Sequence, residues 1–375
     1  MFRGGTILML NFALNFFQLS MPNTIIIGSG SYLPTKVIDK EHFMESVFYT
    51  DEGDKIEKPN EEIIQKFVEI TEIETRRYLE DDEHNSDLGL RAAQVAIADA
   101  GIDQEELDYI IYASNFGEVN RDGMSNFMPS MSARLKNKLG ILNRRTVNYD
   151  MIFGCPGWVE AMIMADTLIK AGKAKLILVV GSETLSRVTD AFDRNKMIFA
   201  DGAGAVVVRA TNETNVGMIA DSTICDNQSE INFLENAPSL KPDEDRRPLY
   251  IRMHGRKIYE YALKNVPIAI KETIDKAGLS IDDIDKILIH QANAKMDYAM
   301  ISRLFKLYGR TEYDHDIAPM TIQQFGNSSV ATIPTMFDLI RKNEMQPHQF
   351  KKGDNVLFAS VGAGMNINAV IYRFP

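Results

Sequence analysis

Two similar segments occur in this chain of 375 residues, and the duplication limits its possible folds more than any other feature. The first begins at Ile97 and reads IADAGIDQEELDYIIYA, and the second begins at Ile274 and reads IDKAGLSIDDIDKILIH. They align without a gap at an offset of 177 residues (274 − 97). Each copy has the pattern of a helix that ends at glycine, followed by an acidic turn and a short apolar strand.

Two further pairs of segments support the duplication. Cys155 follows Phe-Gly in FGCPGWVEAMIMADTLIK, and Asn327 follows the same dipeptide in FGNSSVATIPTMFDLIRK, at an offset of 172 residues (327 − 155). The strand pattern LILVVG at 176–181 matches LFASVG at 357–362, at an offset of 181 (357 − 176). The nearly continuous apolar strands are typical of strands that are covered on both faces. We therefore predict two similar α/β halves, in which only the loop lengths differ.

The predicted boundaries divide the chain into three parts. Residues 213–375 form the second half, residues 21–212 form the first half, and residues 1–20 form an N-terminal extension without catalytic meaning. The extension has an apolar run but no A-x-A-like cleavage site, so a signal peptide is the weaker interpretation. The sequence MPNTIIIGSGSYLP, which begins at Met21, has the pattern of a first strand and turn, and we expect Met21 to be the true start. The polar segment 227–247 predicts a long surface loop.

Composition excludes several classes of function. The net charge of −11 disfavours a general nucleic-acid binder. Two cysteines cannot form a disulfide framework or a multi-cysteine zinc site, and they favour a reducing compartment such as the cytoplasm. No run approaches the roughly 18 apolar residues of a membrane-spanning helix. We expect neither a metal nor a membrane partner.

Cys155 is the candidate nucleophile. Pro156 directly after it is well tolerated in a first helical turn, which places Cys155 at the N-terminus of a helix. There the helix dipole and free N–H groups favour a thiolate, and the N–H of Cys155 could donate to a developing oxyanion. A free cysteine is more often a buried, inert residue than a nucleophile, and we assign that structural role to Cys225.

His290 and Asn327 occupy related junctions of the second half. His290 ends the apolar run IDKILIH, so it lies at the edge of a sheet, where α/β proteins build their sites. Asn327 stands where Cys155 stands in the first half. Each has a structural alternative, a hydrogen-bonded histidine and a helix N-cap. The coincidence of the three residues at equivalent places favours a site.

These residues resemble those of the β-ketoacyl-acyl-carrier-protein synthase III family, in the thiolase superfamily. The resemblance runs from about Thr24 to Phe374. It rests on the stretches IIIGSGSYLP, FGCPGW, LVVGSETLSR, FADGAGAVVV, HQAN, FGNSSVATIP and SVGAGMNINAVIYRF. It implies a thiolase-like α/β fold, in which two pseudo-duplicated halves form layers in the order αβαβα.

The resemblance also implies a decarboxylating Claisen condensation without a bound cofactor. A coenzyme A or acyl carrier protein thioester would acylate Cys155, with the N–H groups of Cys155 and Gly364 as the oxyanion hole. His290 and Asn327 would then stabilise the enolate left when malonyl-acyl carrier protein loses CO2. The products would be 3-oxoacyl-acyl carrier protein, CO2 and the free thiol of the primer carrier.

Further residues match the family by position. Asn293 and Gly255 match the lining of a pantetheine tunnel, Arg194 matches an arginine near the coenzyme A nucleotide, and Phe127 matches an aromatic that reaches the partner subunit's acyl pocket in a homodimer. One predicted helical face carries basic residues that could bind the acidic carrier protein, although such a stripe is usually just solvated. These residues are Lys295, Arg303, Lys306 and Arg310.

The sequence departs from the family at the expected coenzyme A site. The single tryptophan, Trp158, lies beside the nucleophile rather than near the N-terminus, where the family stacks adenine. Lys66 and Ile70 replace an aromatic and an arginine, and Met365 replaces a phenylalanine. These changes favour an alternative in which acyl carrier protein delivers the primer in a secondary lipid or polyketide pathway.

Four other functions stay open from the sequence. A degradative thiolase needs a second catalytic cysteine, and Cys225 is not placed for that role. A hydroxymethylglutaryl-type synthase needs a glutamate, for which Glu118 is the only loop candidate. A Cys-His-Asn thioester hydrolase fits the order of the three residues. A non-catalytic acyl binder on the same scaffold is the fourth.

Overall fold

The computed structural model describes residues 21–246 and 249–375, and the predicted extension at 1–20 lies outside the described residues. The first of two main sheets has the strand order β1-β9-β8-β4-β7. Strand β4 is parallel to β7 and β8, whereas β9 is antiparallel to β8 and β1. The five strands are β1 (Asn23–Tyr32), β4 (Tyr109–Ala113), β7 (Val147–Met151), β8 (Leu176–Thr184) and β9 (Asp201–Thr211).

The second main sheet repeats this arrangement with the order β10-β15-β14-β13. Strand β13 is parallel to β14, and β15 is antiparallel to β14 and β10, as their counterparts are in the first sheet. The strands are β10 (Gly217–Cys225), β13 (Lys286–Ile289), β14 (Asn355–Gly362) and β15 (Asn366–Arg373). The repeat confirms the predicted pseudo-duplication.

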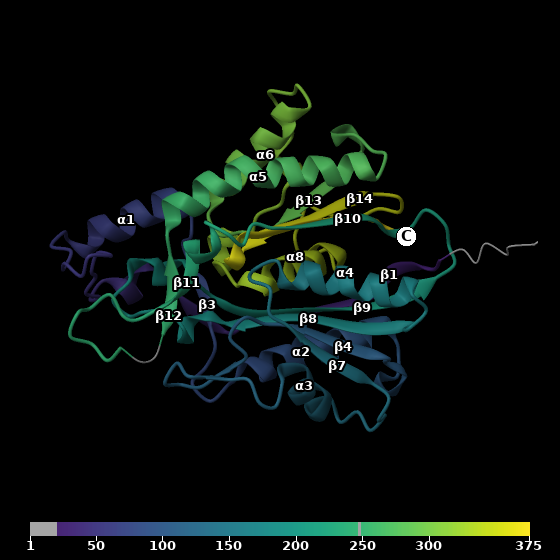
Figure 1. Cartoon of the computed structure of the whole chain (residues 1–375), viewed down its shortest axis with the longest axis horizontal. Helices are drawn as coiled ribbons and strands as arrows, with labels where there is room; N and C mark the ends of the chain where they lie inside the picture. The colour runs from purple at the N-terminus through teal and green to yellow at the C-terminus, as the bar shows by residue number, and fades with distance from the viewer. Residues whose placement is uncertain (1–20, 247–248) are drawn as a thin grey trace, which may run out of the picture.

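Helices cover both faces of both sheets, and Figure 1 shows the resulting five layers in the order αβαβα. The outer layer of the first sheet contains α2 (Asn85–Ala100) and α3 (Met131–Leu139). The outer layer of the second contains α5 (Gly255–Lys276) and α6 (Ala294–Leu307). Between the sheets lie α4 (Gly157–Lys170) and α8 (Thr332–Arg341), which are the helices after Cys155 and Asn327.

The central layer is apolar. One continuous cluster joins side chains of α4 and α8 to both sheets, and a separate cluster lies beneath each outer layer. Trp158 is 1% exposed within the central cluster and stacks edge-on against Phe358. Burial of this apolar area fixes the two helices, and with them the residues at their N-termini.

Smaller elements surround this scaffold. The segment 227–247 was predicted to be a loop, but it contains β11, which pairs antiparallel with β12. The other short elements are β2 (Lys36–Ile38), α1 (Asn60–Thr71), β3 (Arg76–Tyr78), β5 (Glu118–Val119), β6 (Ser125–Asn126), β11 (Leu234–Ala237), β12 (Tyr250–Met253) and α7 (Ile322–Phe325). Within the described ranges, no helix is long and apolar enough to cross a membrane.

Candidate active site

Cys155 lies two residues before α4, in a turn whose backbone is tightly packed. Gly154 has φ +69°, a conformation that disfavours side chains, and a Cβ there would lie 2.6 Å from the nitrogen of Ala363. A Cβ at Gly362 would lie 2.5 Å from the nitrogen of Cys155. The two glycines therefore let the loop after β14 approach the nucleophile backbone to backbone.

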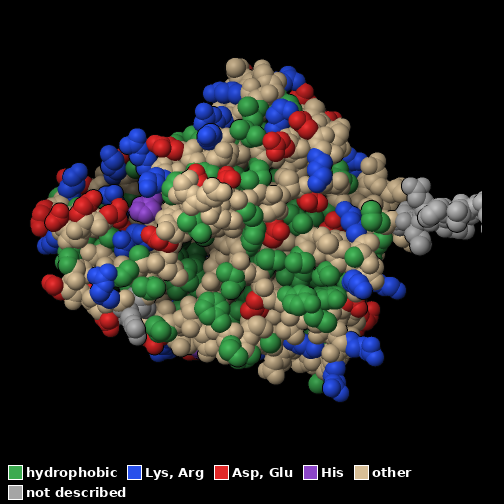
Figure 2. Space-filling view, viewed as in Figure 1, with side chains coloured by type: hydrophobic (Ala, Val, Ile, Leu, Met, Phe, Trp, Pro, Cys, Tyr) green, Lys and Arg blue, Asp and Glu red, His purple; other side chains and the backbone are tan. Residues whose placement is uncertain are grey.

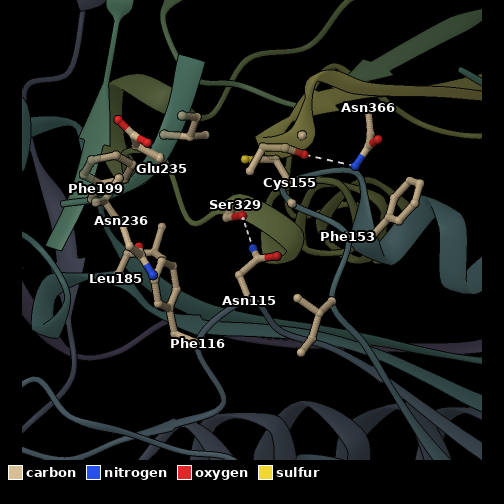
Figure 3. A pocket seen from close by; sticks show the side chains of 16 residues that line it. Asn115, Phe116, Phe153, Cys155, Leu185, Phe199, Glu235, Asn236, Ser329 and Asn366 are labelled. Atoms are coloured by element: carbon tan, nitrogen blue, oxygen red, sulfur yellow. Dashed lines mark hydrogen bonds between the residues drawn. The ribbon is translucent and has the colours of Figure 1, made fainter. Parts of the chain in front are cut away.

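The thiol opens into a cavity of about 340 Å³. Figure 3 shows Cys155 at its centre, with Asn366 and Phe153 on one side and Phe199, Leu185 and Phe116 on the other. Residues Leu234 to Asn236 of β11 also line the cavity. The sequence had predicted a surface loop for this segment and no part in the site. An apolar chamber beside a reactive thiol can hold an acyl chain.

Burial raises the pKa of the Cys155 thiol to about 11, and the Ser329 side chain opposes this by hydrogen bonding to it. The expectation that the helix N-terminus yields a thiolate is therefore not met in the free protein, because desolvation of the charged form outweighs the favourable contacts. A protonated thiol is the resting form at neutral pH.

His290 follows the last residue of β13 and is 2% exposed. Its backbone N–H donates to the carbonyl of Ala359 on β14 at 2.8 Å. Burial lowers the pKa of the imidazole to about 4, against an opposing hydrogen bond with the Ser329 backbone. His290 is consequently neutral at physiological pH. Its Nδ1 has no hydrogen-bond partner among the described residues.

Asn327 is 3% exposed, and its side-chain orientation is fixed. The Ser329 N–H donates to Asn327 Oδ1 at 2.8 Å, so the oxygen is occupied and Nδ2 is left to donate. Gly326 before it has φ +67°, close to the φ of +69° at Gly154. Unlike α4, α8 begins only at Thr332, after a 3-10 turn at Ser329–Ala331.

Ser329 connects all three predicted catalytic residues. Its side chain faces the thiol of Cys155, and its backbone contacts the imidazole of His290 and the amide of Asn327. Its φ of +52° is uncommon for a residue with a side chain, which indicates that neighbouring contacts hold it there. Sequence reasoning missed Ser329, although it is the last residue of the quoted GNSS stretch.

The other residues of HQAN support this arrangement. Gln291 is fully buried, and its Oε1 accepts the N–H groups of Thr321 and Ile322 at 2.8 and 3.0 Å. Asn293 caps α6 by accepting the Met296 N–H at 3.1 Å. The structure thus gives Asn293 a capping contact and places no cavity beside it among those described.

The remaining predicted residues lie in three places. Gly364 lines the cavity of Cys155, with φ +74°. Arg194 and Gly255 together line a second cavity of about 590 Å³, whose lining includes both acidic residues (Asp51 and Glu52) and further basic residues (Arg256 and Lys257). Phe127, at 47% exposure, lies after β6, and its ring borders the backbone of Gly117.

The basic residues Lys295, Arg303 and Lys306 are exposed on α6, and Lys and Arg side chains lie near this helix in Figure 2. Arg310, the fourth member of the predicted stripe, instead pairs with Asp282. The helix therefore presents positive charge on a molecule that is acidic as a whole.

The two residues considered for a hydroxymethylglutaryl-type synthase and a degradative thiolase, Glu118 and Cys225, lie outside the cavity of Cys155. Glu118 accepts hydrogen bonds from the N–H and hydroxyl of Ser86 at 2.9 and 2.6 Å, which anchors the start of α2. Cys225 is exposed at the end of β10 and lines a different, polar cavity, so its assignment as a buried cysteine is wrong. Neither residue is among those that line the cavity of Cys155. In the described part of the chain, no cluster of His, Cys, Asp or Glu could hold a metal ion.

The five-layered fold, with a cysteine before one central helix and an asparagine before the other, defines a thiolase-like condensing enzyme, an acyltransferase. The family model of 3-oxoacyl-(acyl-carrier-protein) synthase III matches residues 149–227, and the model of its C-terminal part matches residues 274–374. The chain belongs to the 3-oxoacyl-(acyl-carrier-protein) synthase III family.

Similar proteins match over nearly the whole chain. The β-ketoacyl-(acyl-carrier-protein) synthase III of Clostridium perfringens SM101 is 31% identical over 359 residues, which cover 94% of this chain and 100% of that protein. Synthase III 1 of Vibrio vulnificus YJ016 is 31% identical, at 93% and 99% coverage. The crystal structure of synthase III from Aquifex aeolicus superposes with a TM-score of 0.76 at 28% identity, at 94% and 100% coverage.

Proposed function

We propose that the protein condenses an acyl primer bound to Cys155 with malonyl-acyl carrier protein, giving 3-oxoacyl-acyl carrier protein and CO2. The observation that carries this proposal is the convergence on Ser329 of a thiol, a neutral imidazole and an oriented amide. The family membership and the printed names of the relatives support the same reaction.

In the first half-reaction, Cys155 Sγ attacks the thioester carbonyl of the primer. A new C–S bond forms, the carrier thiol leaves, and the proton of Cys155 ends on that thiol. The N–H groups of Cys155 and Gly364 are the proposed donors to the tetrahedral oxyanion, and both residues line the cavity. The apolar wall formed by Phe116, Leu185 and Phe199 would hold the acyl chain.

In the second half-reaction, His290 and Asn327 donate to the thioester carbonyl of the malonyl group. Cleavage of its C–C bond releases CO2, and the electron pair forms an enolate that the two donors stabilise. The enolate carbon attacks acyl-Cys155, and the thiolate of Cys155 leaves. A neutral donor such as His290 suits this step, because it stabilises the enolate without quenching it by protonation.

The choice of primer carrier is a second proposal. Trp158 is buried in the central core, so it cannot stack on an adenine at the surface. The cavity that Arg194 lines carries acidic Asp51 and Glu52 and also basic Arg256 and Lys257, so its charges select neither for nor against the phosphates of coenzyme A. The missing surface tryptophan favours acyl carrier protein as the primer donor, with Lys295, Arg303 and Lys306 as its docking residues.

We also propose a homodimer in the cytoplasm. Strand β7 is the outer strand of the first sheet and exposes Val147 and Tyr149, and Ile152 follows at 61% exposure. Figure 2 shows hydrophobic side chains gathered in the region of β7 and α4. Edge-to-edge pairing of two copies would cover this edge and bring Phe127 to the partner's site. Sedimentation of wild type and Tyr149→Asp would test it, and a monomeric wild type would contradict it.

The decisive experiment combines acyl-coenzyme A and acyl-carrier-protein thioesters with malonyl-acyl carrier protein, and follows intact mass, CO2 and 3-oxoacyl product. We expect an acyl adduct on the wild type but not on Cys155→Ala. Adducts from acyl carrier protein alone would support it as the donor. Hydrolysis of the adduct without CO2 release would instead indicate a thioester hydrolase, and no adduct from any donor would indicate a binder.

A further inference from the structure

A buried glutamate lies close to the nucleophile and has no part in the mechanism above. Glu183, on β8, is fully buried, and a negative charge on it would raise the pKa of the Cys155 thiol, so any assistance that it gives to the thiolate must come from its hydrogen bonds. Because β4 and β8 are parallel neighbours with Ala113 opposite Gly181, the residues after both strands meet at one edge of the sheet. Glu183 therefore reaches the turn that follows β4.

Glu183 holds that turn at its backbone. The N–H of Asn115 donates to Glu183 Oε1 at 2.5 Å, and Ser114 Oγ lies 3.4 Å from Oε2. A buried N–H that lost this acceptor would be left without a partner, which is costly in the interior of a protein. The carboxyl group consequently fixes the position of the Asn115 backbone.

Asn115 in turn contacts Ser329 from across the cavity. Its Nδ2 donates to Ser329 Oγ at 3.3 Å, and Figure 3 shows these two side chains pointing toward one another. A serine hydroxyl has one hydrogen to donate and two lone pairs to accept. When Asn115 donates into one lone pair, the hydrogen of the hydroxyl is left for the sulfur of Cys155.

We propose that Glu183 and Asn115 are positioning residues that orient the hydroxyl of Ser329 toward Cys155 and so promote formation of the attacking thiolate. The chain of contacts runs from β8 through the turn after β4 to the 3-10 turn before α8. It joins the two duplicated halves at the nucleophile. The inference deepens the proposed function, but it concerns thiol reactivity, which can be measured without any carrier-protein substrate.

The test measures alkylation of Cys155 by iodoacetamide at pH 7, in a Cys225→Ser background, by intact mass. We expect Ser329→Ala and Asn115→Leu each to lower the rate constant about tenfold to 100-fold, as loss of one hydrogen bond to a charged group implies. The double variant should alkylate no more slowly than Ser329→Ala alone, because Asn115 acts through Ser329. Additive losses would overturn the proposal.

Glu183 is tested by a pair of substitutions. Glu183→Gln keeps an oxygen acceptor for the Asn115 N–H and should retain at least half of the wild-type rate, whereas Glu183→Leu should match Asn115→Leu. Asp338→Leu is the control for general destabilisation, because Asp338 is also a buried hydrogen-bonded carboxylate but contacts Ser29 and Ser31. Equal rates for Glu183→Leu and the wild type would overturn the role of Glu183.

A second readout separates positioning of the thiol from a general disturbance of the site. In a Cys155→Ala background, Asn115→Leu should leave decarboxylation of malonyl-acyl carrier protein unchanged, because His290 and Asn327 contact the backbone of Ser329. A parallel loss of decarboxylation would show that the substitution disturbs the whole site. If decarboxylation is absent from Cys155→Ala itself, the proposed function fails while the alkylation result still stands.

Discussion

The Cys155 thiol illustrates how burial and a helix N-terminus compete at one residue. Position in the sequence favoured a thiolate, yet desolvation raises the pKa to about 11. We therefore expect the rate of alkylation by iodoacetamide to rise about tenfold per pH unit between pH 7 and pH 10, since the thiolate is the nucleophile. Exposed Cys225, mapped in the same samples, is the internal comparison. A plateau for Cys155 below pH 8 would contradict the assignment.

His290 and Asn327 should matter for only one half of the reaction. Because removal of one oxyanion donor typically costs about 100-fold or more in rate, His290→Ala and Asn327→Ala should lower malonyl decarboxylation by that factor. Acylation of Cys155 should change less than about threefold. With its pKa near 4, His290 stays neutral above pH 6, so decarboxylation should be flat from pH 6 to pH 9. A fall below pH 7 would indicate a histidine that titrates normally.

At the scale of elements, α6 combines two separable tasks. Asn293 caps the start of the helix, three residues after His290, and Lys295, Arg303 and Lys306 lie exposed along it. Reversing two charges, in Lys295→Glu/Lys306→Glu, should raise the KM for malonyl-acyl carrier protein about tenfold or more at low salt. The KM for a malonyl-pantetheine substrate should not change. Equal effects on both substrates would mean that α6 does not dock the carrier protein.

The elements that sequence reasoning predicted well are those with strong local patterns. The glycine-ended helices and apolar strands of the repeat were predicted because hydrophobic periodicity and caps act within a few residues. Strand β11 was missed, because Leu234 to Asn236 are held by pairing with β12 rather than by a pattern of their own. Ser329 was missed for a similar reason, since its contacts come from three distant segments.

For the whole molecule, the buried acids link stability to pH. Burial raises the pKa of Glu183 to about 8 and that of Asp201, on neighbouring β9, to about 6. An acid whose pKa is higher in the folded state stabilises the fold below its unfolded pKa, near 4.5, and loses this contribution as pH rises through its folded pKa. The wild type should therefore lose stability between about pH 5 and pH 8.

Glu183→Gln removes the larger of the two pH-dependent contributions to stability while keeping the shape of the side chain. We expect its stability relative to the wild type to increase with pH across that window, by at most about 1.4 kcal/mol per pH unit. Urea unfolding at pH 5, 6, 7 and 8 measures the difference in stability. Asp338→Asn is the matched control, because Asp338 is a buried carboxylate that accepts hydrogen bonds from Ser29 and Ser31 and does not contact Glu183. A difference that is constant with pH would mean that Glu183 is ionised in the folded protein. It would then repel the thiolate of Cys155 throughout the physiological range rather than only above about pH 8.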